Sequence, residues 1–366
     1  MTDVMGTVRV KPRAMEDLMF AIMKGGGCND AEARATAEHL IGANLSGHDS
    51  HGIVRITRYH GWMRDGTFKP GMPLRPVLDT PTLVQFDGQQ GIGQYLCREA
   101  TLVGIERAKA HGLAIVSLRR AGHIGRLGHY AEMAAEEGLA SIQFCNVVNS
   151  EIVAPYGAAQ RTMSTNPIAV GVPAADSDPF ILDFATSYVA EGKALVAASG
   201  GKPLPADAMV SADGDFTGDP AALYGATAAS ALPNPRAGLG ALRTMGEHKG
   251  SGLALACDLL AGALTGNGTN VGEHPFGNGW LAIFIDPAKL DDTAIFGAEV
   301  GAYIENVRNA RPAKGVDQVR IPGDVERQTR ALRLVEGLPL SPRLLDAVVD
   351  VAAELSLGVS QNDLLM

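Results

Sequence analysis

The 366 residues are 46% hydrophobic and 19% charged, which fits one large domain or two interlocked domains and excludes large-scale disorder. No run of about 18 uncharged apolar residues occurs, so we expect no membrane span. The 31 basic and 40 acidic residues give a formal net charge of −9, and because the basic residues are scattered we expect neither nucleic acid nor a membrane surface as a partner.

The first part of the chain shows apolar residues at helical spacing. This spacing predicts three helices, and Asn29 with Glu32 forms a capping-box pattern in front of the second. A proline-rich connector then ends the helical part, because proline cannot continue a regular element. The predicted helices span 14–24, 30–45 and about 50–65, with a cap at Ser50, and the connector spans 69–76.

Short apolar runs alternate with helical segments in the middle of the chain. Repeated helix-to-strand units favour a mixed α/β sheet with both faces covered. The chain then returns to helix near its end. Strands are predicted within 82–86, 110–118, 136–144, 166–174, 180–184 and 280–286, and helices over 96–110, 125–138, 250–264 (as a long buried helix), 330–337 and 344–356.

The connector suggests a domain boundary. We expect residues 1–78 and about 310–366 to form a helical substrate and dimerisation region, and residues 79–309 to form an α/β domain. The four cysteines lie far apart without a C-x-x-C pair, and the first residues lack the apolar core of a signal peptide. A reducing, cytoplasmic setting is therefore expected. The cysteines are Cys28, Cys97, Cys145 and Cys257.

The segment GHDSHGIVRITRY carries the most informative polar pattern. If Ser50 caps a helix, then His51, Arg55 and either Arg58 or Tyr59 project from one face. An imidazole can move a proton near neutral pH, and a guanidinium can clamp a carboxylate, so the pattern suits a hydroxy or keto acid. The alternative interpretation is a solvated polar helix face.

Glycines punctuate a second segment, in which His123 lies between a predicted strand and a predicted helix. Gly122, Gly125 and Gly128 form G-x-x-G-x-x-G, which is neither the dinucleotide fingerprint G-x-G-x-x-G nor a P-loop. Such a turn can expose backbone N–H groups to a phosphate. A purely structural glycine turn is an equally good interpretation.

Polar side chains also interrupt or end two apolar runs, at Thr165, Asn166, Asp183, Thr186 and Ser187. Polar groups at strand ends are candidates for ligand contacts, and turn formation is the alternative.

Two smaller clusters remain. His248 and Lys249 precede a predicted helix, where the lysine can reach a phosphate or ribose or be solvated. His48, Asp49 and His51 are close in sequence and allow a metal-dependent lyase as a remote alternative, although no metal-ligand motif supports it.

Several motifs, in this order, resemble the malate/L-lactate dehydrogenase family of the non-Rossmann type, over nearly the whole chain. They are SHGIVRITRY, GHIGRLGHYAEMAAEEGLA, APYGAAQRTMSTNPIAVGVPA, ILDFATS, HKGSGLALACDLLAGALTG and VRIPGDVER. The family includes ureidoglycolate dehydrogenase, sulfolactate dehydrogenase, 2,3-diketogulonate reductase and Δ1-piperideine-2-carboxylate reductase. The resemblance implies a homodimer with a non-Rossmann mixed-sheet dinucleotide-binding domain, flanked by a helical N- and C-terminal domain.

The resemblance also implies an NAD- or NADP-dependent oxidoreductase acting on a small anionic 2-hydroxy acid or its 2-keto acid. In one branch of the family the substrate is a cyclic imino acid instead. Lys193, after Gly192, matches the G-K form of the hydroxy-acid members. The sequence does not choose between NAD and NADP, and it does not name the acid.

Site roles follow from the same resemblance. His51, with Ser50 beside it, matches the catalytic acid/base, and His123 is the competing catalytic histidine. Arg55 and Thr165 match substrate-binding positions, with Arg55 as the carboxylate clamp, and the helix-face spacing adds Tyr59 as a further substrate-binding candidate. The matching cofactor contacts, together with His248 beside them, are His123, Ile124, Gly125, Arg126, Leu127, Asn146, Asp183, Phe184, Ala185, Thr186, Lys249, Gly323 and Asp324.

Overall fold

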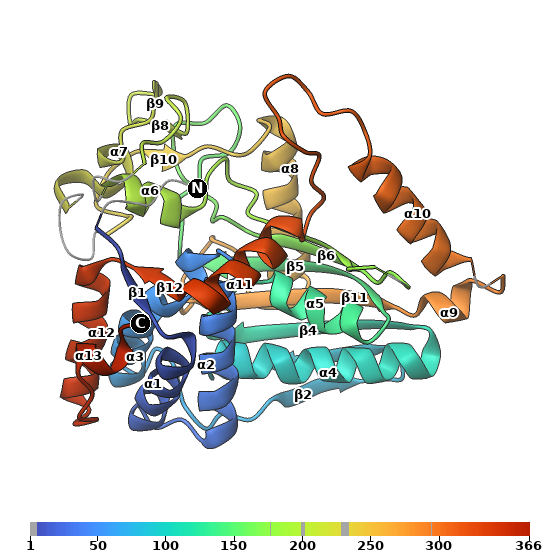
Figure 1. Cartoon of the computed structure of the whole chain (residues 1–366), viewed down its shortest axis with the longest axis horizontal. Helices are drawn as coiled ribbons and strands as arrows, with labels where there is room; N and C mark the ends of the chain where they lie inside the picture. The colour runs from blue at the N-terminus through green and yellow to red at the C-terminus, as the bar shows by residue number, and fades with distance from the viewer. Residues whose placement is uncertain (1–5, 176, 199–201, 228–233, 294) are drawn as a thin grey trace.

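The two ends of the chain form one helical region in the computed structural model, which describes residues 6–175, 177–198, 202–227, 234–293 and 295–366 (Figure 1). Strand β1 pairs antiparallel with β12, and apolar side chains from both ends share one core. The elements of this region are β1 (Val8–Val10), α1 (Pro12–Gly25), α2 (Asp30–Leu45), α3 (Ile56–Arg64), α11 (Asp324–Glu336), β12 (Leu338–Leu340), α12 (Pro342–Glu354) and α13 (Gln361–Leu364).

The first two predicted helices are confirmed, and so is the capping box of the second. The backbone N–H of Glu32 donates to Asn29 Oδ1 at 3.0 Å, and that of Asn29 donates to Glu32 Oε2 at 2.9 Å. These bonds satisfy two donors that would otherwise be unpaired at the start of α2.

The third predicted helix is wrong in its first part. Two 3₁₀ turns, η1 (Asp49–His51) and η2 (Ile53–Arg55), precede α3. They are separated by Gly52, whose ψ of −147° lies outside the helical range. Ser50 therefore does not cap an α-helix, and the predicted stacking of His51 over Arg55 on one helical face does not occur.

A seven-stranded sheet forms the middle of the molecule, which confirms a mixed α/β fold. Its order is β2-β3-β4-β11-β5-β6-β7, and only β3 and β4 run parallel. Strand β11 comes from late in the chain and lies antiparallel between β4 and β5. The strands are β2 (Arg75–Asp79), β3 (Leu83–Asp87), β4 (Leu113–Ala121), β5 (Ala140–Val148), β6 (Ile168–Val172), β7 (Phe180–Phe184) and β11 (Gly277–Ile285).

Helices cover one face of this sheet along its length and the other face only in part. On the first face lie α4 (Gly93–His111) and α5 (Gly128–Glu136), and a Cβ on Gly104 would come within 2.3 Å of Phe284. On the second face, α8 (His248–Cys257) leads into the π-helix η4 (Asp258–Ala263). A Cβ on Gly279 would lie 2.0 Å from the carbonyl oxygen of Ala261 in η4.

The expectation that both faces are covered is therefore wrong. The residues paired across the second face form an apolar row in which Leu83 and Ile142 are 41% and 37% exposed. The helix predicted over 250–264 is wrong in two respects, because its second half is a π-helix and because Leu255, Leu259 and Leu264 are exposed. The apolar row is Leu83, Ile115, Ile283, Ile142, Val170 and Leu182.

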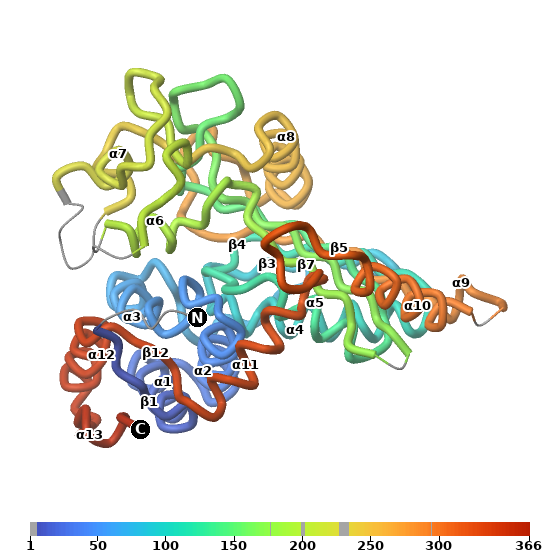
Figure 2. Tube along the Cα trace, turned by 45° about the horizontal axis from the view of Figure 1, so that its top comes forward, coloured from blue at the N-terminus to red at the C-terminus, as the bar shows by residue number. Residues whose placement is uncertain are grey.

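A smaller region with a core of its own lies beside the helical region (Figure 2). It contains the three-stranded sheet β10-β8-β9. Its elements are α6 (Glu191–Ala198), β8 (Met209–Val210), β9 (Phe216–Thr217), α7 (Ala221–Tyr224) followed by the 3₁₀ turn η3 (Gly225–Thr227), and β10 (Ala241–Leu242).

Two further helices, α9 (Pro287–Leu290) and α10 (Phe296–Arg308), extend away from the rest of the molecule (Figure 2). Only Ile304 of α10 is buried, and Tyr303 is exposed. In the part of the chain that the structure describes, no helix is both long enough and apolar enough to cross a membrane.

Candidate active site

The two turns around Gly52 are fixed by Asn44, a buried residue of α2. Its side-chain oxygen accepts a hydrogen bond from the backbone N–H of Ile53 at 2.7 Å, and its side-chain nitrogen donates to Asp49 at 2.6 Å. A Cβ at position 52 would lie only 2.0 Å from Asn44 Oδ1. Glycine is therefore required here, and this contact sets the position of His51.

His51 and His123 lie side by side although 72 positions separate them in the sequence. Their rings are nearly parallel, with an interplanar angle of 9° and centroids 5.7 Å apart. His123 belongs to the turn between β4 and α5, and the next residue, Ile124, donates its backbone N–H to Asn278 Oδ1 at 2.9 Å. Two imidazoles from distant parts of the chain thus lie next to each other.

A short chain of hydrogen bonds fixes the proton position on His123. Gln94 Nε2 donates to the hydroxyl oxygen of Tyr59 at 2.6 Å, and that hydroxyl lies 2.6 Å from His123 Nδ1. With Gln94 donating to the Tyr59 oxygen, the hydroxyl's one proton has His123 Nδ1 as its acceptor at hydrogen-bond distance, and we take this direction of the bond. The network therefore assigns neutral His123 the tautomer with its proton on Nε2.

Both histidines are neutral at pH 7. Burial away from water lowers the pKa of His51 well below 6.5, and the positive charge of Arg55 lowers it further. Burial, then Arg55, then His51 act in the same direction on the pKa of His123. The side chain of Ser50 lies 3.2 Å from His51 Nδ1 and is the hydrogen-bonding partner of that atom.

Arg55 bridges the helical region and the smaller region. Its Nε donates to the backbone oxygen of Ser50 at 2.5 Å, and its Nη2 lies 3.6 Å from Glu191 on α6. The Tyr224 hydroxyl of α7 also contacts Glu191 Oε1, at 3.4 Å. Within the described ranges the contacts of Arg55 use only Nε and Nη2, so its guanidinium has further N–H groups that could bind a ligand.

The glycine turn after His123 is occupied by protein groups. A Cβ on Gly125 would lie 2.2 Å from the His39 ring, and the backbone N–H of Arg126 donates to His39 Nε2 at 2.7 Å. The N–H of Gly128 donates to Asp183 at 2.9 Å. The N–H groups of Arg126 and Gly128 therefore already have acceptors, which favours the structural interpretation of this glycine turn, and the cofactor contacts of His123–Leu127 stay a prediction.

Two other predicted cofactor residues, Asn146 and Thr186, are buried and have hydrogen-bond partners within the protein. The amide of Asn146 is fully buried and bonds to Gly268 and Asn267. Thr186 donates to the backbone oxygen of Thr165 at 3.0 Å, and its own carbonyl accepts from Met245.

His248 and Lys249 are exposed on the first turn of α8. Phe184 and Ala185 lie between Asp183 and Thr186 and are half-buried. The contacts of all these residues with a cofactor stay predictions.

Gly323 and Asp324 lie at the start of α11, beside β7. Gly323 has a φ of +100°, which favours glycine, and the Asp324 carboxylate binds Arg308 at 2.7 Å and Arg327 at 2.8 Å. The N–H of Ile181 in β7 donates to the neighbouring Pro322 carbonyl. These contacts connect α10, α11 and the edge of the sheet.

The residues of the metal alternative contact different partners. His48 lies 3.1 Å from Glu326, Asp49 binds Arg333, and His51 contacts Ser50. Among the residues that the structure describes, no group of three His, Cys, Asp or Glu side chains could hold a metal ion. The geometry therefore gives the lyase hypothesis no ligand set.

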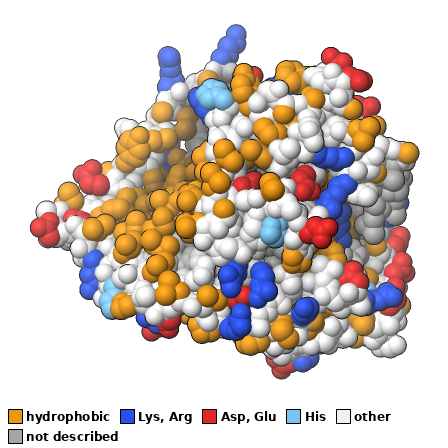
Figure 3. Space-filling model, turned by 180° about the vertical axis from the view of Figure 1, so that it is seen from behind, with side chains coloured by type: hydrophobic (Ala, Val, Ile, Leu, Met, Phe, Trp, Pro, Cys, Tyr) orange, Lys and Arg blue, Asp and Glu red, His pale blue; other side chains and the backbone are white. Residues whose placement is uncertain are grey.

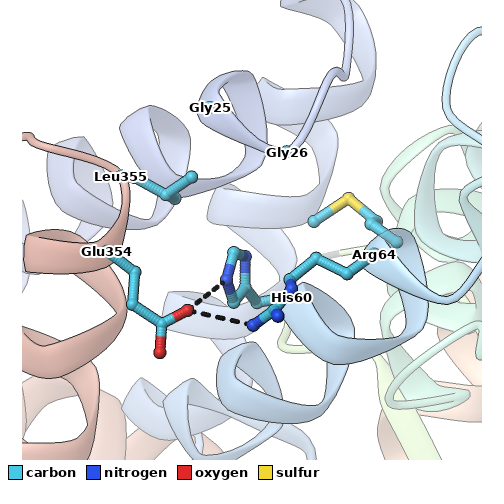
Figure 4. Close-up of a pocket in the computed structure, with 7 residues that line it drawn as sticks. Gly25, Gly26, His60, Arg64, Glu354 and Leu355 are labelled. Carbon is cyan, nitrogen blue, oxygen red and sulfur yellow. Dashed lines mark hydrogen bonds and ion pairs between the residues drawn. The ribbon is translucent and has the colours of Figure 1, made fainter.

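A pocket lies apart from the histidine pair. It measures about 550 Å³ and involves α1, α3 and α12. In it, His60 and Arg64 both bind Glu354, next to Leu355 (Figure 4). These contacts tie α3 to α12 and so support the helix that carries Tyr59.

Four residues that position the site were not predicted from the sequence. Asn44, His39 and Gln94 are buried, and Glu191 contacts Arg55 from another region. The signal in the sequence is weak: Asn44, His39 and Gln94 are polar positions inside helices whose buried residues are mostly small or apolar.

A family model described as malate/L-lactate dehydrogenase matches residues 10–349. The chain belongs to this family. An L-lactate dehydrogenase of Cupriavidus necator is 35% identical over 329 residues, covering 88% of this chain and 91% of the relative. Hydroxycarboxylate dehydrogenase B of Escherichia coli K12 is 34% identical and covers 95% of each chain.

A solved structure agrees with these matches. The malate dehydrogenase of Pyrococcus horikoshii superposes with a TM-score of 0.85 at 27% identity, covering 98% of this chain and 99% of that one. The chain is accordingly a dehydrogenase that acts on the CH–OH group of hydroxy acids, in a family that depends on a pyridine nucleotide.

Proposed function

We propose that this chain interconverts a small 2-hydroxy acid and its 2-keto acid with NAD or NADP, with His51 as the acid/base and Arg55 as the carboxylate clamp. The observation that carries the proposal is the pair of neutral, stacked imidazoles of His51 and His123 beside Arg55. A neutral imidazole can accept the hydroxyl proton, and a guanidinium can bind a carboxylate through two parallel hydrogen bonds.

The hydrogen bonds suggest different roles for the two histidines. His123 Nδ1 already accepts the Tyr59 proton, so His123 offers an Nε2–H that can donate to the substrate oxygen. His51 has no such fixed donor, because its partner is the rotatable hydroxyl of Ser50. His51 is therefore the better proton acceptor during oxidation and the proton donor during reduction.

The exposed His248 and Lys249 on the first turn of α8 fit a cofactor phosphate, because Lys249 adds a positive charge and His248 a hydrogen-bonding group to the N-terminal end of a helix. A pyridine nucleotide bound there would supply the hydride acceptor for oxidation and the hydride donor for reduction. Thr165, half-buried beside Thr186, stays a predicted substrate contact.

The decisive test replaces His51 by alanine. General acid/base assistance is worth about 10²–10⁴ in rate, so turnover of 2-hydroxy acids should fall by that factor. Binding of NADH or NADPH, followed by fluorescence, should change little. His111→Ala, at an exposed position near the end of α4, is the matched control and should keep wild-type turnover.

Other outcomes of this test are equally informative. Full activity of His51→Ala would transfer the acid/base role to His123. Wild-type protein that reduces Δ1-piperideine-2-carboxylate but oxidises no 2-hydroxy acid with either cofactor would replace the proposed substrate class by the cyclic imino acid.

We also infer that the chain forms a homodimer through the open face of the seven-stranded sheet. The apolar row across that face would otherwise remain in water, and hydrophobic side chains gather over a broad area when the molecule is seen from behind (Figure 3). An apolar area of this kind marks an interaction site in soluble proteins. The exposed face of α10 offers further apolar contact.

Light scattering tests the dimer. Ile142→Asp places a carboxylate in the middle of the row and should shift the wild-type dimer toward monomer. Leu102→Asp is the control, because Leu102 is 42% exposed on α4, which covers the opposite face. A wild-type monomer, or a dimer that survives the Ile142 substitution, would contradict this interface.

The cysteines agree with a reducing, cytoplasmic setting, which we propose for the chain. Cys28, Cys97, Cys145 and Cys257 are all buried free thiols. Burial raises the pKa of Cys28 and Cys257 to about 12, so neither carries the thiolate that reacts in redox chemistry.

A further inference from the structure

Arg58 is a charged side chain of the candidate site that has no partner among the described residues. It lies on α3 one turn after Arg55, is half-buried, and forms no hydrogen bond or ion pair in the described part of the chain. Its charge acts on His123, so it lies close to the histidine pair. Burial and the positive charge of Arg55 lower the pKa of Arg58. A cation in such a place costs free energy unless an anion compensates it.

The neighbouring groups do not provide that anion. Glu191 acts on Arg58 from a distance, but its carboxylate already contacts Arg55 at 3.6 Å and Tyr224 at 3.4 Å. Arg236 adds a further positive charge. Both histidines are neutral, and the negative charge of Glu191 compensates the positive charge of Arg55. The positive charge of Arg58 therefore has no compensating anion among the described residues.

The spacing between the two arginines matches one kind of substrate. Positions three apart on a helix face have Cβ atoms about 5–6 Å apart. Long arginine side chains from such positions can converge on two anionic groups of one small molecule. Acids in which two carbon atoms separate the anionic groups, such as malate and sulfolactate, have a comparable span.

We propose that Arg58 binds a second anionic group of the substrate, so that the preferred 2-hydroxy acid carries a carboxylate or sulfonate in addition to the carboxylate held by Arg55. This inference rests on the proposed function, because it assigns Arg55 to the C1 carboxylate. Arg58 is then a specificity-determining residue, because it contributes to the binding of acids with two anionic groups and not to the binding of lactate.

The test compares kcat/KM for malate, sulfolactate and lactate in the full-length wild-type chain and in Arg58→Gln. A hydrogen bond to a charged group is worth a factor of about 10–150, so Arg58→Gln should lower kcat/KM by that factor for the acid with the fitting second group. The value for lactate should not change. Malate and sulfolactate, assayed separately, distinguish a carboxylate from a sulfonate as that group.

Two further variants keep the test specific. Arg58→Lys retains the charge but not the paired N–H groups, so its kcat/KM for the acid with the fitting second group should lie between the values of wild type and Arg58→Gln. Arg13→Gln removes the same charge from an exposed position on α1, where Arg13 pairs only within its own helix among the described residues, and should behave as wild type with all three acids.

The inference is overturned if Arg58→Gln changes all three acids equally, or changes none. It is also overturned if the substitution weakens NADH or NADPH binding instead, since Arg58 would then serve the cofactor. Calorimetric titration with malate and lactate measures binding without turnover. If wild type binds malate more tightly than lactate and Arg58→Gln loses this difference, the role of Arg58 is supported even when wild type oxidises no acid. The absence of oxidation would then refute only the proposed reaction.

Discussion

Tyr59→Phe tests whether the hydrogen bonds around His123 set its proton position. The substitution removes one hydroxyl and leaves the rest of the buried ring in place. It leaves the Gln94 amide without its acceptor and His123 Nδ1 without its donor, since both bonds, each 2.6 Å long, go to that hydroxyl.

The magnitude follows from these two bonds. A buried polar group left unpaired costs about 1–3 kcal/mol, so the free energy of unfolding should fall by about that amount. The bias toward the Nε2–H tautomer is worth one hydrogen bond, about 0.5–1.5 kcal/mol, which corresponds to a fall in kcat of about 2–13-fold. KM for the acid should change little, because Arg55 is untouched.

The assay combines kcat and KM in both directions with urea unfolding. Tyr130→Phe is the matched control: its hydroxyl is also buried and donates at 2.6 Å, but to the backbone oxygen of Ile124. It should lose similar stability and keep kcat. Wild-type kcat in Tyr59→Phe, together with the expected stability loss, would refute the tautomer argument and leave Tyr59 with a structural role only.

Three further predictions concern the turn at Gly52, the histidine pair and His39. Gly52→Ala should lower the free energy of unfolding by about 1–3 kcal/mol through overpacking against Asn44, and it should also lower activity. The control Gly61→Ala has open space around its Cβ in α3 and should raise the free energy of unfolding by about 0.4–1 kcal/mol. Equal unfolding free energies of the two variants would contradict this prediction. Because the pKa values of His51 and His123 are lowered, kcat/KM for oxidation should stay constant as the pH falls to 6.5 and should decline only at lower pH. A decline that starts above pH 6.5 would argue against a buried base. His39 takes up a proton near pH 6.5 in the unfolded chain, whereas burial lowers its pKa in the folded protein and keeps it neutral. Between pH 6.5 and 5.5 the free energy of unfolding, measured by urea titration, should therefore fall by about 1 kcal/mol more in wild type than in His39→Gln. Equal falls in the two proteins would contradict this prediction.

Local patterns predicted the elements that local interactions stabilise. The capping box of Asn29 and Glu32 and the apolar runs of the sheet strands are encoded within a few residues, and both are confirmed. The turn at Gly52 was missed because the group that requires a glycine is Asn44, on a different helix. Spacing alone therefore extended α3 too far.

The same limit applies to the site and to the surface. The alignment of Tyr59 with His123 and of Arg55 with Glu191 depends on contacts between distant segments, which no local pattern contains. The open sheet face was missed for a different reason. A strand buried by a helix and a strand buried by a second copy of the chain show the same apolar residues, so the sequence predicts burial without naming the partner.

In the proposed reaction, with Arg55 as carboxylate clamp and His51 as base, the charge of Arg55 connects substrate binding to proton transfer. In the free protein this charge helps to lower the pKa of His51, which keeps the base neutral but also weak. A carboxylate bound to Arg55 compensates the positive charge and so raises the pKa of His51 toward neutral pH, where a base both remains deprotonated and accepts a proton readily. The acidic limb of kcat, which reports the complex, should therefore lie at higher pH than that of kcat/KM, which reports the free protein. Coinciding limbs would mean that Arg55 does not hold the carboxylate close to His51.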